Sequence, residues 1–221
     1  ARPAETAPAC GPADAQRTPG ARRNLVKSER WPSSNSAKLS SRASSTAARA
    51  SSVSGGRGLP SARFTDSFTF SSFATAYHHL TMNSTDGASD TFAQGAAVTV
   101  AGNYTLTAGT HASKGNNLTV TGTSTVQSGG VFELYGAETL PTLTLNSGST
   151  VKYTGDGDSA NDSYTLNAWT YHHLTIAGTD AGDSFAATGT LTLGGNFTQS
   201  GGTFSAPTTL NVPGNFSRTG G

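Results

Sequence analysis

Residues 191–198 read Leu-Thr-Leu-Gly-Gly-Asn-Phe-Thr, and residues 210–217 repeat the pattern as Leu-Asn-Val-Pro-Gly-Asn-Phe-Ser. Both stretches place an apolar, a polar and an apolar residue before a Gly-Asn step, which an aromatic and a hydroxyl residue follow. The same order occurs at residues 98–105 as Val-Thr-Val-Ala-Gly-Asn-Tyr-Thr. A second block, Tyr-His-His-Leu-Thr followed by Met or Ile, occupies residues 77–82 and 171–176. The chain is therefore predicted to be a repeat array.

Each apolar-polar-apolar core predicts a short β-strand with its two apolar side chains on one face. The first residues of such cores lie 18, 20, 25, 31, 17 and 19 residues apart, and whole groups of blocks recur after roughly 93 residues. The cores are Leu80–Met82, Val98–Val100, Leu118–Val120, Leu143–Leu145, Leu174–Ile176, Leu191–Leu193 and Leu210–Val212. One short strand cannot bury its apolar face alone, whereas stacked equivalent strands build a continuous core.

The Gly-Asn step predicts a corner between two strands, because Gly and Asn tolerate positive φ. The aromatic residue after it (Tyr104, Phe197 or Phe216) is expected to turn inward, and Asn residues at equivalent corners are expected to form a ladder. The predicted fold is therefore all-β, a right-handed parallel β-helix (β-solenoid), with an immunoglobulin-like β-sandwich as the alternative. In the solenoid, six apolar residues are expected to stack in one column: Leu80, Val98, Leu118, Leu174, Leu191 and Leu210.

Charge divides the chain into two regions. Residues 1–63 hold 11 of the 14 Lys and Arg residues and 3 of the 13 Asp and Glu residues, and they are rich in Ser, Ala and Arg. This composition predicts a disordered basic segment, followed by a solenoid domain over residues 64–221 that is incomplete at its C-terminus. Aromatic residues are scarce in the basic segment, so no specific nucleic-acid binding is expected. One cysteine excludes an internal disulfide, and no apolar run is long enough for a membrane span.

A resemblance rests on three motifs in fixed order: Gly-Ser-Thr-Val-Lys-Tyr-Thr-Gly at 148–155, Tyr-His-His-Leu-Thr-Ile-Ala-Gly at 171–178, and the stretch at 191–198. This order resembles the repeat units of large bacterial surface and secreted proteins of the adhesin or filamentous-haemagglutinin-like kind, over about residues 68–221. The resemblance implies an extracellular or cell-surface location. It also implies adhesion or scaffolding rather than catalysis, with glycans or cell-surface proteins as partners.

A Gly-rich acidic stretch, Gly-Asp-Gly-Asp-Ser-Ala-Asn-Asp at 155–162, offers the candidate metal ligands Asp156, Asp158 and Asp162. Carboxylates at alternate positions of a Gly-rich loop suit Ca²⁺, which prefers oxygen ligands. The EF-hand pattern fails, because its twelfth position is Asn167 rather than Glu. A solvated acidic turn without an ion is the alternative, and no other cofactor is predicted.

Other constellations predict no catalytic residue. Adjacent histidines in a strand point to opposite faces, so His78 and His79 are not expected to hold one ion together. Polysaccharide-cleaving β-helix enzymes gather Asp with Lys or Arg on one outer face. After residue 63 the basic residues are Lys114, Lys152 and Arg218. Carboxylate pairs for glycoside hydrolysis would be Asp180 with Asp183 or Glu133 with Glu138.

Threonines are expected on the outer face of the strands, at Thr81, Thr99, Thr119, Thr144, Thr175 and Thr192. The predicted function is a non-enzymatic extracellular repeat protein, either an adhesin-like stalk or an interaction scaffold. The alternatives are a β-helical enzyme acting on polysaccharide and an ice-binding protein that uses a flat threonine ladder. An open strand edge at the end of the solenoid is expected to promote self-association.

Overall fold

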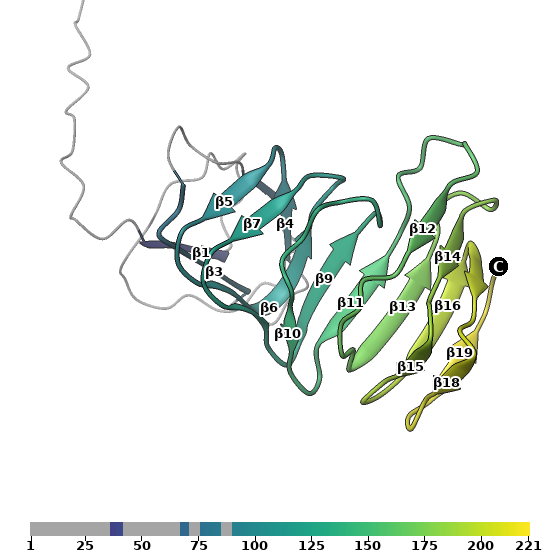
Figure 1. Cartoon of the computed structure of the whole chain (residues 1–221). Helices are drawn as coiled ribbons and strands as arrows, with labels where there is room; N and C mark the ends of the chain where they lie inside the picture. The colour runs from purple at the N-terminus through teal and green to yellow at the C-terminus, as the bar shows by residue number, and fades with distance from the viewer. Residues whose placement is uncertain (1–35, 42–66, 71–75, 85–89) are drawn as a thin grey trace, which may run out of the picture. The chain divides into compact units, whose positions relative to one another are not determined.

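The computed structural model describes residues 36–41, 67–70, 76–84 and 90–221 (Figure 1). These residues form nineteen strands and no helix. Every pair of strands is parallel, which confirms the predicted β-solenoid and excludes the antiparallel sandwich. The chain winds through about seven turns. Within the described ranges, no helix has the length and apolarity needed to cross a lipid bilayer.

The main sheet contains twelve strands in two columns that share β6. The first column consists of β1 (Ser36–Ser41), β3 (His79–Ser84), β6 (Tyr104–Ala112), β8 (Ser124–Val126) and β10 (Thr144–Leu145). The second consists of β2 (Ser67–Phe70), β4 (Thr91–Gln94), β6, β9 (Gly130–Leu134), β11 (Thr150–Tyr153), β13 (His173–Ala177), β16 (Phe197–Gly201) and β19 (Phe216–Arg218).

Strand β6 joins the two columns because it changes direction at Gly109. Residues Tyr104–Leu106 pair with β8, and Gly109–Ala112 pair with β9. Gly109 has φ of +87°, and a Cβ atom there would lie 2.9 Å from the Asp90 carbonyl oxygen. Glycine therefore permits both the backbone conformation and the close approach at this bend.

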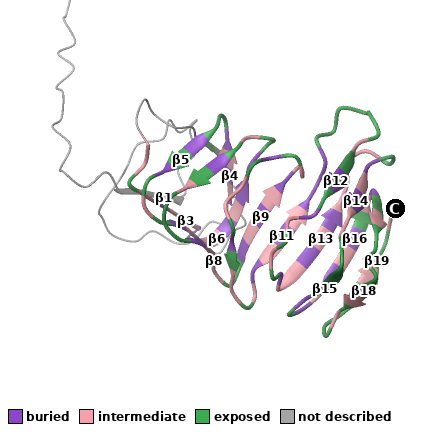
Figure 2. Ribbon diagram, viewed as in Figure 1, coloured by how far each residue is buried: buried purple, intermediate pink, exposed green. Residues whose placement is uncertain are grey.

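The remaining strands form three smaller parallel sheets on other sides of the coils. These are β5 (Val98–Val100) with β7 (Leu118–Val120), β12 (Ser163–Thr165) with β14 (Ser184–Ala186) and β17 (Thr203–Ser205), and β15 (Thr190–Thr192) with β18 (Thr209–Asn211). Side chains alternate between buried and partly exposed along β9, β11 and β13, as period-two strands require (Figure 2).

The core is a stack of apolar and aromatic side chains held in register from coil to coil. One column passes through Phe92, His111, Phe132, Val151, Leu174 and Phe197. All six are at most 1% exposed. Removing their apolar surface from water is the main stabilising contribution, at about 25 cal/mol per Å² buried.

Two expectations need correction. The six apolar residues predicted to share one column lie on different sides: Val98 pairs with Leu118 and Leu191 with Leu210, whereas Leu174 pairs with Phe197. Similar short cores occur on several sides of each coil, so two cores with similar sequences need not occupy equivalent positions.

Strand β1 lies inside the segment predicted to be disordered, where Ser36–Ser41 pairs with β3. An unpaired strand edge offers hydrogen bonds that outweigh low local hydrophobicity. The rest of residues 1–63 lies outside the described residues, and its predicted disorder stays a prediction.

Candidate functional site

The repeated Tyr-His-His and Gly-Asn blocks meet at the corners of successive coils. The Asn103 amide donates to Nδ1 of His79 at 2.8 Å, and the Asn196 amide donates to Nδ1 of His173 at 2.9 Å. The second histidine of each block therefore serves as a neutral acceptor for the next corner. Burial lowers the pKa of His173, with a further contribution from neighbouring His172, which keeps Nδ1 available.

Asparagines extend these corners as a ladder. The Asn103 side-chain oxygen accepts from the Thr123 amide at 3.1 Å, Asn117 from Thr139 at 2.8 Å, and Asn196 from Asn215 at 2.9 Å. Each bond joins one coil to the next, from an asparagine side chain to a backbone amide. Only the bond between Asn196 and Asn215 joins two asparagines, so a ladder of stacked asparagine side chains stays a prediction. The repeated corner residues are thus explained by packing rather than by chemistry.

The prediction that the paired histidines point to opposite faces is wrong. The rings of His78 and His79 meet edge to face with centroids 4.3 Å apart, and those of His172 and His173 do the same. Strands β3 and β13 begin only at the second histidine, so the first lies in the preceding bend, where strand alternation does not apply.

A buried polar chain crosses the core at His111. The Tyr104 hydroxyl lies 2.7 Å from His111 Nδ1, and His111 Nε2 lies 3.2 Å from Gln94 Oε1. The Gln94 amide donates to the Asn117 carbonyl at 2.6 Å. Desolvation lowers the pKa of His111 to about 3. The ring is neutral and fully partnered in the core, so it has no access to a ligand.

The predicted threonines do not form one row, but two of them belong to a regular one. Thr81, Thr105, Thr125 and Thr144 are in register on β3, β6, β8 and β10, and all four are partly or fully exposed. We call this set the threonine row. Thr99 pairs with Thr119 on another side, and Thr175 pairs with Thr198 in the second column.

Three charged residues at the second column form one small cluster. Lys114 Nζ lies 3.4 Å and Lys152 Nζ 3.0 Å from the two oxygens of the Glu133 carboxylate. Both lysines are well exposed, and such surface ion pairs contribute little to stability. The other member of the candidate carboxylate pair, Glu138, is buried.

Glu138 closes the turn after β9. Its Oε1 accepts hydrogen bonds from the Ser113 hydroxyl at 2.6 Å and from the amides of Tyr135 at 2.8 Å and Gly115 at 3.1 Å. Its Oε2 accepts from the Gly136 amide at 2.7 Å. Four donors thus satisfy the buried carboxylate, which gives Glu138 a structural role.

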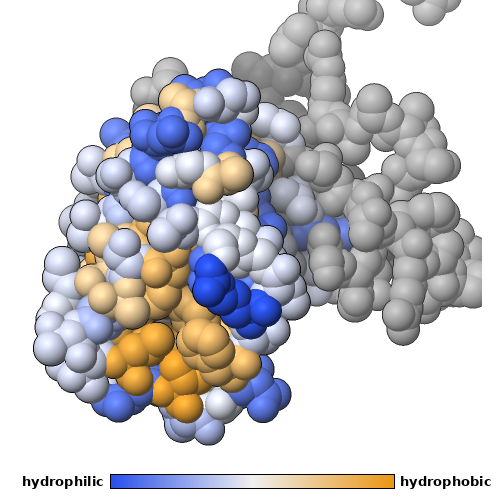
Figure 3. Space-filling model, turned by 90° about the vertical axis from the view of Figure 1, so that its right-hand side faces the viewer, coloured by the Kyte–Doolittle hydropathy of each residue, from blue (hydrophilic) through white to orange (hydrophobic). Residues whose placement is uncertain are grey.

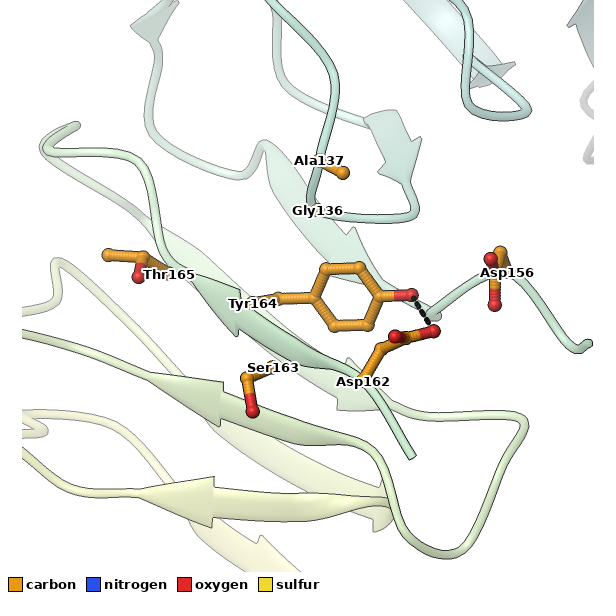
Figure 4. Close-up of a pocket in the computed structure, with 7 residues that line it drawn as sticks. All are labelled: Gly136, Ala137, Asp156, Asp162, Ser163, Tyr164 and Thr165. Carbon is orange, nitrogen blue, oxygen red and sulfur yellow. Dashed lines mark hydrogen bonds between the residues drawn. The ribbon is translucent and has the colours of Figure 1, made fainter. Parts of the chain in front are cut away.

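The acidic stretch forms a loop between β11 and β12 that brings its three candidate ligands together. Oxygens of Asp156, Asp158 and Asp162 all lie within 4.8 Å of one another, and the first two residues are exposed. Asp156 and Asp162 both lie on the hydroxyl side of the Tyr164 ring (Figure 4). The Tyr164 hydroxyl donates to Asp162 Oδ2 at 3.5 Å.

Asp183, before β14, lies beneath this loop. It is fully buried, and its Oδ1 accepts from the Asp162 amide at 3.1 Å. Its Oδ2 has no hydrogen-bond partner, and a Cβ atom at Gly155 would clash with it. The carboxylate therefore sits between the two ends of the loop.

Several carboxylates lie close together at this loop, and their negative charges repel one another. Desolvation raises the pKa of Asp183, with further contributions from Asp180, Asp162 and Asp156. Desolvation and the charges of Asp156, Asp183 and Asp162 also raise the pKa of Tyr164, so its hydroxyl stays protonated at neutral pH. Asp180 is partly exposed, yet its Oδ2 is a buried atom without a partner.

Apolar side chains gather on the face at the C-terminal end of the described stack (Figure 3). Phe216 is 59% exposed and stacks on Phe197, with ring centroids 5.1 Å apart. Leu210 and Val212 are partly buried against the same core. The predicted self-association through this edge stays a prediction.

No protein family, curated protein or solved structure matches this chain. The acidic loop was predicted as a candidate site, whereas Asp183 was considered only as a partner of Asp180. The signal that would have joined Asp183 to the loop is its place one coil after Asp162: these residues immediately precede the paired strands β12 and β14.

Proposed function

We propose that this chain is a non-enzymatic extracellular β-solenoid scaffold whose outer face binds glycans or cell-surface proteins, as expected for an adhesin-like stalk. The threonine row is the observation that carries the proposal. Four hydroxyl side chains stand in register on parallel strands, at the strand spacing of about 4.8 Å. This arrangement presents a repeating set of donors and acceptors without a pocket.

Hydroxyl groups that repeat at a fixed spacing match ligands that themselves repeat. Each threonine offers one donor and two acceptor positions, which suits the hydroxyl groups of a polysaccharide. Single contacts of this kind are weak in water, and several in one row raise affinity through effective concentration. Two further polar side chains lie beside the row, two positions after Thr144 and Thr125. The Asn146 side-chain amide donates to Gln127 Oε1 at 2.6 Å.

The buried polar groups support a structural interpretation of the interior. His111 and Glu138, which are buried, and the partly exposed corner residues His79 and His173 are engaged in hydrogen bonds between coils. These groups would otherwise be the first candidates for acid–base chemistry. Their engagement favours a scaffold over an enzyme that uses core residues.

An ice-binding function is the second candidate, because the threonine row also provides the regular hydroxyl array that this function needs. The row is short and lies on one column only. A polysaccharide-acting enzyme would instead use the cluster of Glu133 with Lys114 and Lys152 on the second column.

The full chain, screened on an array of defined oligosaccharides, tests the proposal. Thr105→Lys with Thr125→Lys is expected to reduce binding at least tenfold, because two long charged side chains then cover the row. The matched control is Thr192→Lys, which places one such side chain on exposed β15. Binding that survives the row variant would overturn the proposal. Release of reducing ends would favour the enzyme, and row-dependent inhibition of ice recrystallisation would favour ice binding.

A further inference from the structure

Three carboxylates of the acidic loop converge at distances that suit one ion. Ligand oxygens of Asp156, Asp158 and Asp162 lie within 4.8 Å of one another. Calcium binds oxygen at 2.3–2.6 Å, so two ligands on opposite sides of one ion are separated by about 5 Å. No large rearrangement of these side chains is needed to reach a common ion.

A second observation, on a different coil, concerns the carboxylate beneath the same loop. Asp183 is fully buried under the loop, and its Oδ2 has no hydrogen-bond partner. Its other oxygen accepts from the amide of Asp162, and Oδ2 lies against Gly155, at the opposite end of the loop. A buried carboxylate oxygen without a donor is costly unless a cation compensates it.

Comparison with the other corners shows why this carboxylate is unusual. At the His-His and asparagine corners the side chain that accepts an amide from the neighbouring coil is an imidazole or a carboxamide: His79, Asn103, Asn117, His173 or Asn196. Glu138 also accepts an amide of the neighbouring coil, that of Gly115, but three further donors satisfy it. Asn at position 183 would make the same hydrogen bond to the Asp162 amide. The ladder therefore does not require the negative charge of Asp183.

No protein cation offsets this charge among the described residues. The ion pairs present there join Lys114 and Lys152 to Glu133, on the second column. Asp180 adds another carboxylate, with a buried oxygen that has no partner. An excess of unpaired negative charge in one place is what a divalent cation neutralises.

We propose that the loop of residues 155–162, together with Asp183 beneath it, binds a calcium ion. Asp156, Asp158 and Asp162 supply the ligand oxygens, and Asp183 supplies a charge at the base of the site. All available ligands are hard oxygens, and no His or Cys belongs to the group, which disfavours zinc. Calcium is favoured over magnesium because an exposed loop with irregular ligands suits its flexible geometry. Bound calcium would link the end of β11 to the start of β12, above the Asp183 carboxylate that precedes β14.

The full chain, stripped with EDTA and titrated with CaCl2, tests the proposal by calorimetry. We expect one site, with a dissociation constant of about 10⁻⁵–10⁻³ M, as for extracellular calcium modules and weaker sensors. Terbium provides a second readout, because the Tyr164 ring lies beside Asp162 and can transfer excitation to a bound lanthanide. Sensitised terbium emission that CaCl2 displaces is the expected result.

Variants distinguish binding at this site from unspecific attraction of calcium to acidic residues elsewhere. Asp158→Asn and Asp183→Asn are each expected to weaken calcium binding at least tenfold, whereas Glu133→Gln, on the second column, leaves it unchanged. Tyr164→Phe is expected to abolish terbium emission while calorimetry still detects calcium. The proposal is overturned if CaCl2 at about 5 mM, roughly five times the weak end of the range, gives neither heat nor displacement, or if Glu133→Gln weakens binding as much as Asp158→Asn.

Discussion

Glu138 and Asp183 are both carboxylates buried at the ends of strands, yet their surroundings differ. Glu138 receives four hydrogen bonds, from one hydroxyl and three backbone amides. Asp183 receives one, and its second oxygen has none. Desolvation is the main cause that raises the pKa of Asp183, and the negative charges of neighbouring aspartates raise it further. Burial alone therefore does not distinguish a structural carboxylate from one available to a ligand, whereas the count of donors does.

The largest change in stability is expected when Glu138, the carboxylate with four hydrogen bonds, is removed. Glu138→Ala leaves three amides without their acceptor and leaves the Ser113 hydroxyl with only the Glu133 carbonyl oxygen, which should lower the free energy of unfolding by about 4 kcal/mol. Urea unfolding at neutral pH measures this loss, and calcium should not restore it. Glu138→Gln is the milder control, because it keeps one acceptor oxygen. A loss under 1 kcal/mol for the alanine variant would show that the four hydrogen bonds are not structural.

Acidification tests a second satisfied group, His111. The folded-state pKa is about 3 and the ordinary value is 6.5, so between these values the unfolded chain binds the proton more readily. The contribution of the neutral ring is present above pH 6.5 and is lost as the pH falls toward 3. The slope is at most about 1.4 kcal/mol per pH unit.

Urea unfolding between pH 7 and pH 4.5 measures this slope. The double variant His111→Phe with Tyr104→Phe removes the titrating ring together with its hydroxyl partner, and the slope should become shallower. An unchanged slope in that variant would assign the acid sensitivity to other groups.

The corner histidine is expected to contribute less, because it makes one hydrogen bond at a partly exposed site. His173→Ala leaves the Asn196 amide without its acceptor and should cost about 1 kcal/mol. His173→Asn restores a short acceptor, as at the asparagine corners, and should recover part of that loss. Thermal unfolding of both variants measures the difference. If Asn is no better than Ala, ring packing rather than the Nδ1 acceptor stabilises the corner.

The smallest change in stability is expected for Asp183→Asn in the absence of calcium. In EDTA, Asp183→Asn removes a buried charge while retaining an acceptor for the Asp162 amide, so the free energy of unfolding should rise by roughly 0.5–1 kcal/mol. Saturating calcium should reverse the order and make the unsubstituted chain the more stable one. Paired unfolding curves in EDTA and in CaCl2 measure both signs. A variant that is less stable in both conditions would place Asp183 with Glu138 as a structural residue.

Much of the fold follows from the repeated blocks. The cores around Leu80, Val98 and Leu118 became β3, β5 and β7, and the aromatic residues Tyr104 and Phe197 turn inward after their Gly-Asn corners. The strands depend on local alternation. The positive φ predicted for the Gly-Asn corners is wrong, because neither Gly102 nor Gly195 has one. Glycine is needed there because a Cβ atom at Gly102 would clash with the His78 carbonyl oxygen and one at Gly195 would lie 2.6 Å from the His173 ring, which are contacts between coils.

The register between strands, and the side of the coil on which each strand lies, were harder to predict. The sides on which Val98 and Leu191 lie depend on coil length, which loops change without altering the cores. The contact between His172 and His173 depends on one bend that strand alternation ignores. Asp183 joins the acidic loop only across a coil, so its role requires the stacked register of β12 and β14.

The corner ladder also determines how the stack would respond to force. Its bonds, from His79 to Asn103 and from Asn103 to Thr123, run from coil to coil, alongside the strand hydrogen bonds. A pull that separates the coils therefore loads few bonds at a time and releases one coil before the next. Each released coil lengthens the chain by about 70 Å, given some 20 residues at up to 3.6 Å each. A calcium ion in the loop between β11 and β12 would attract the Asp183 carboxylate, which belongs to the next coil, and would raise the force at which peeling passes this point.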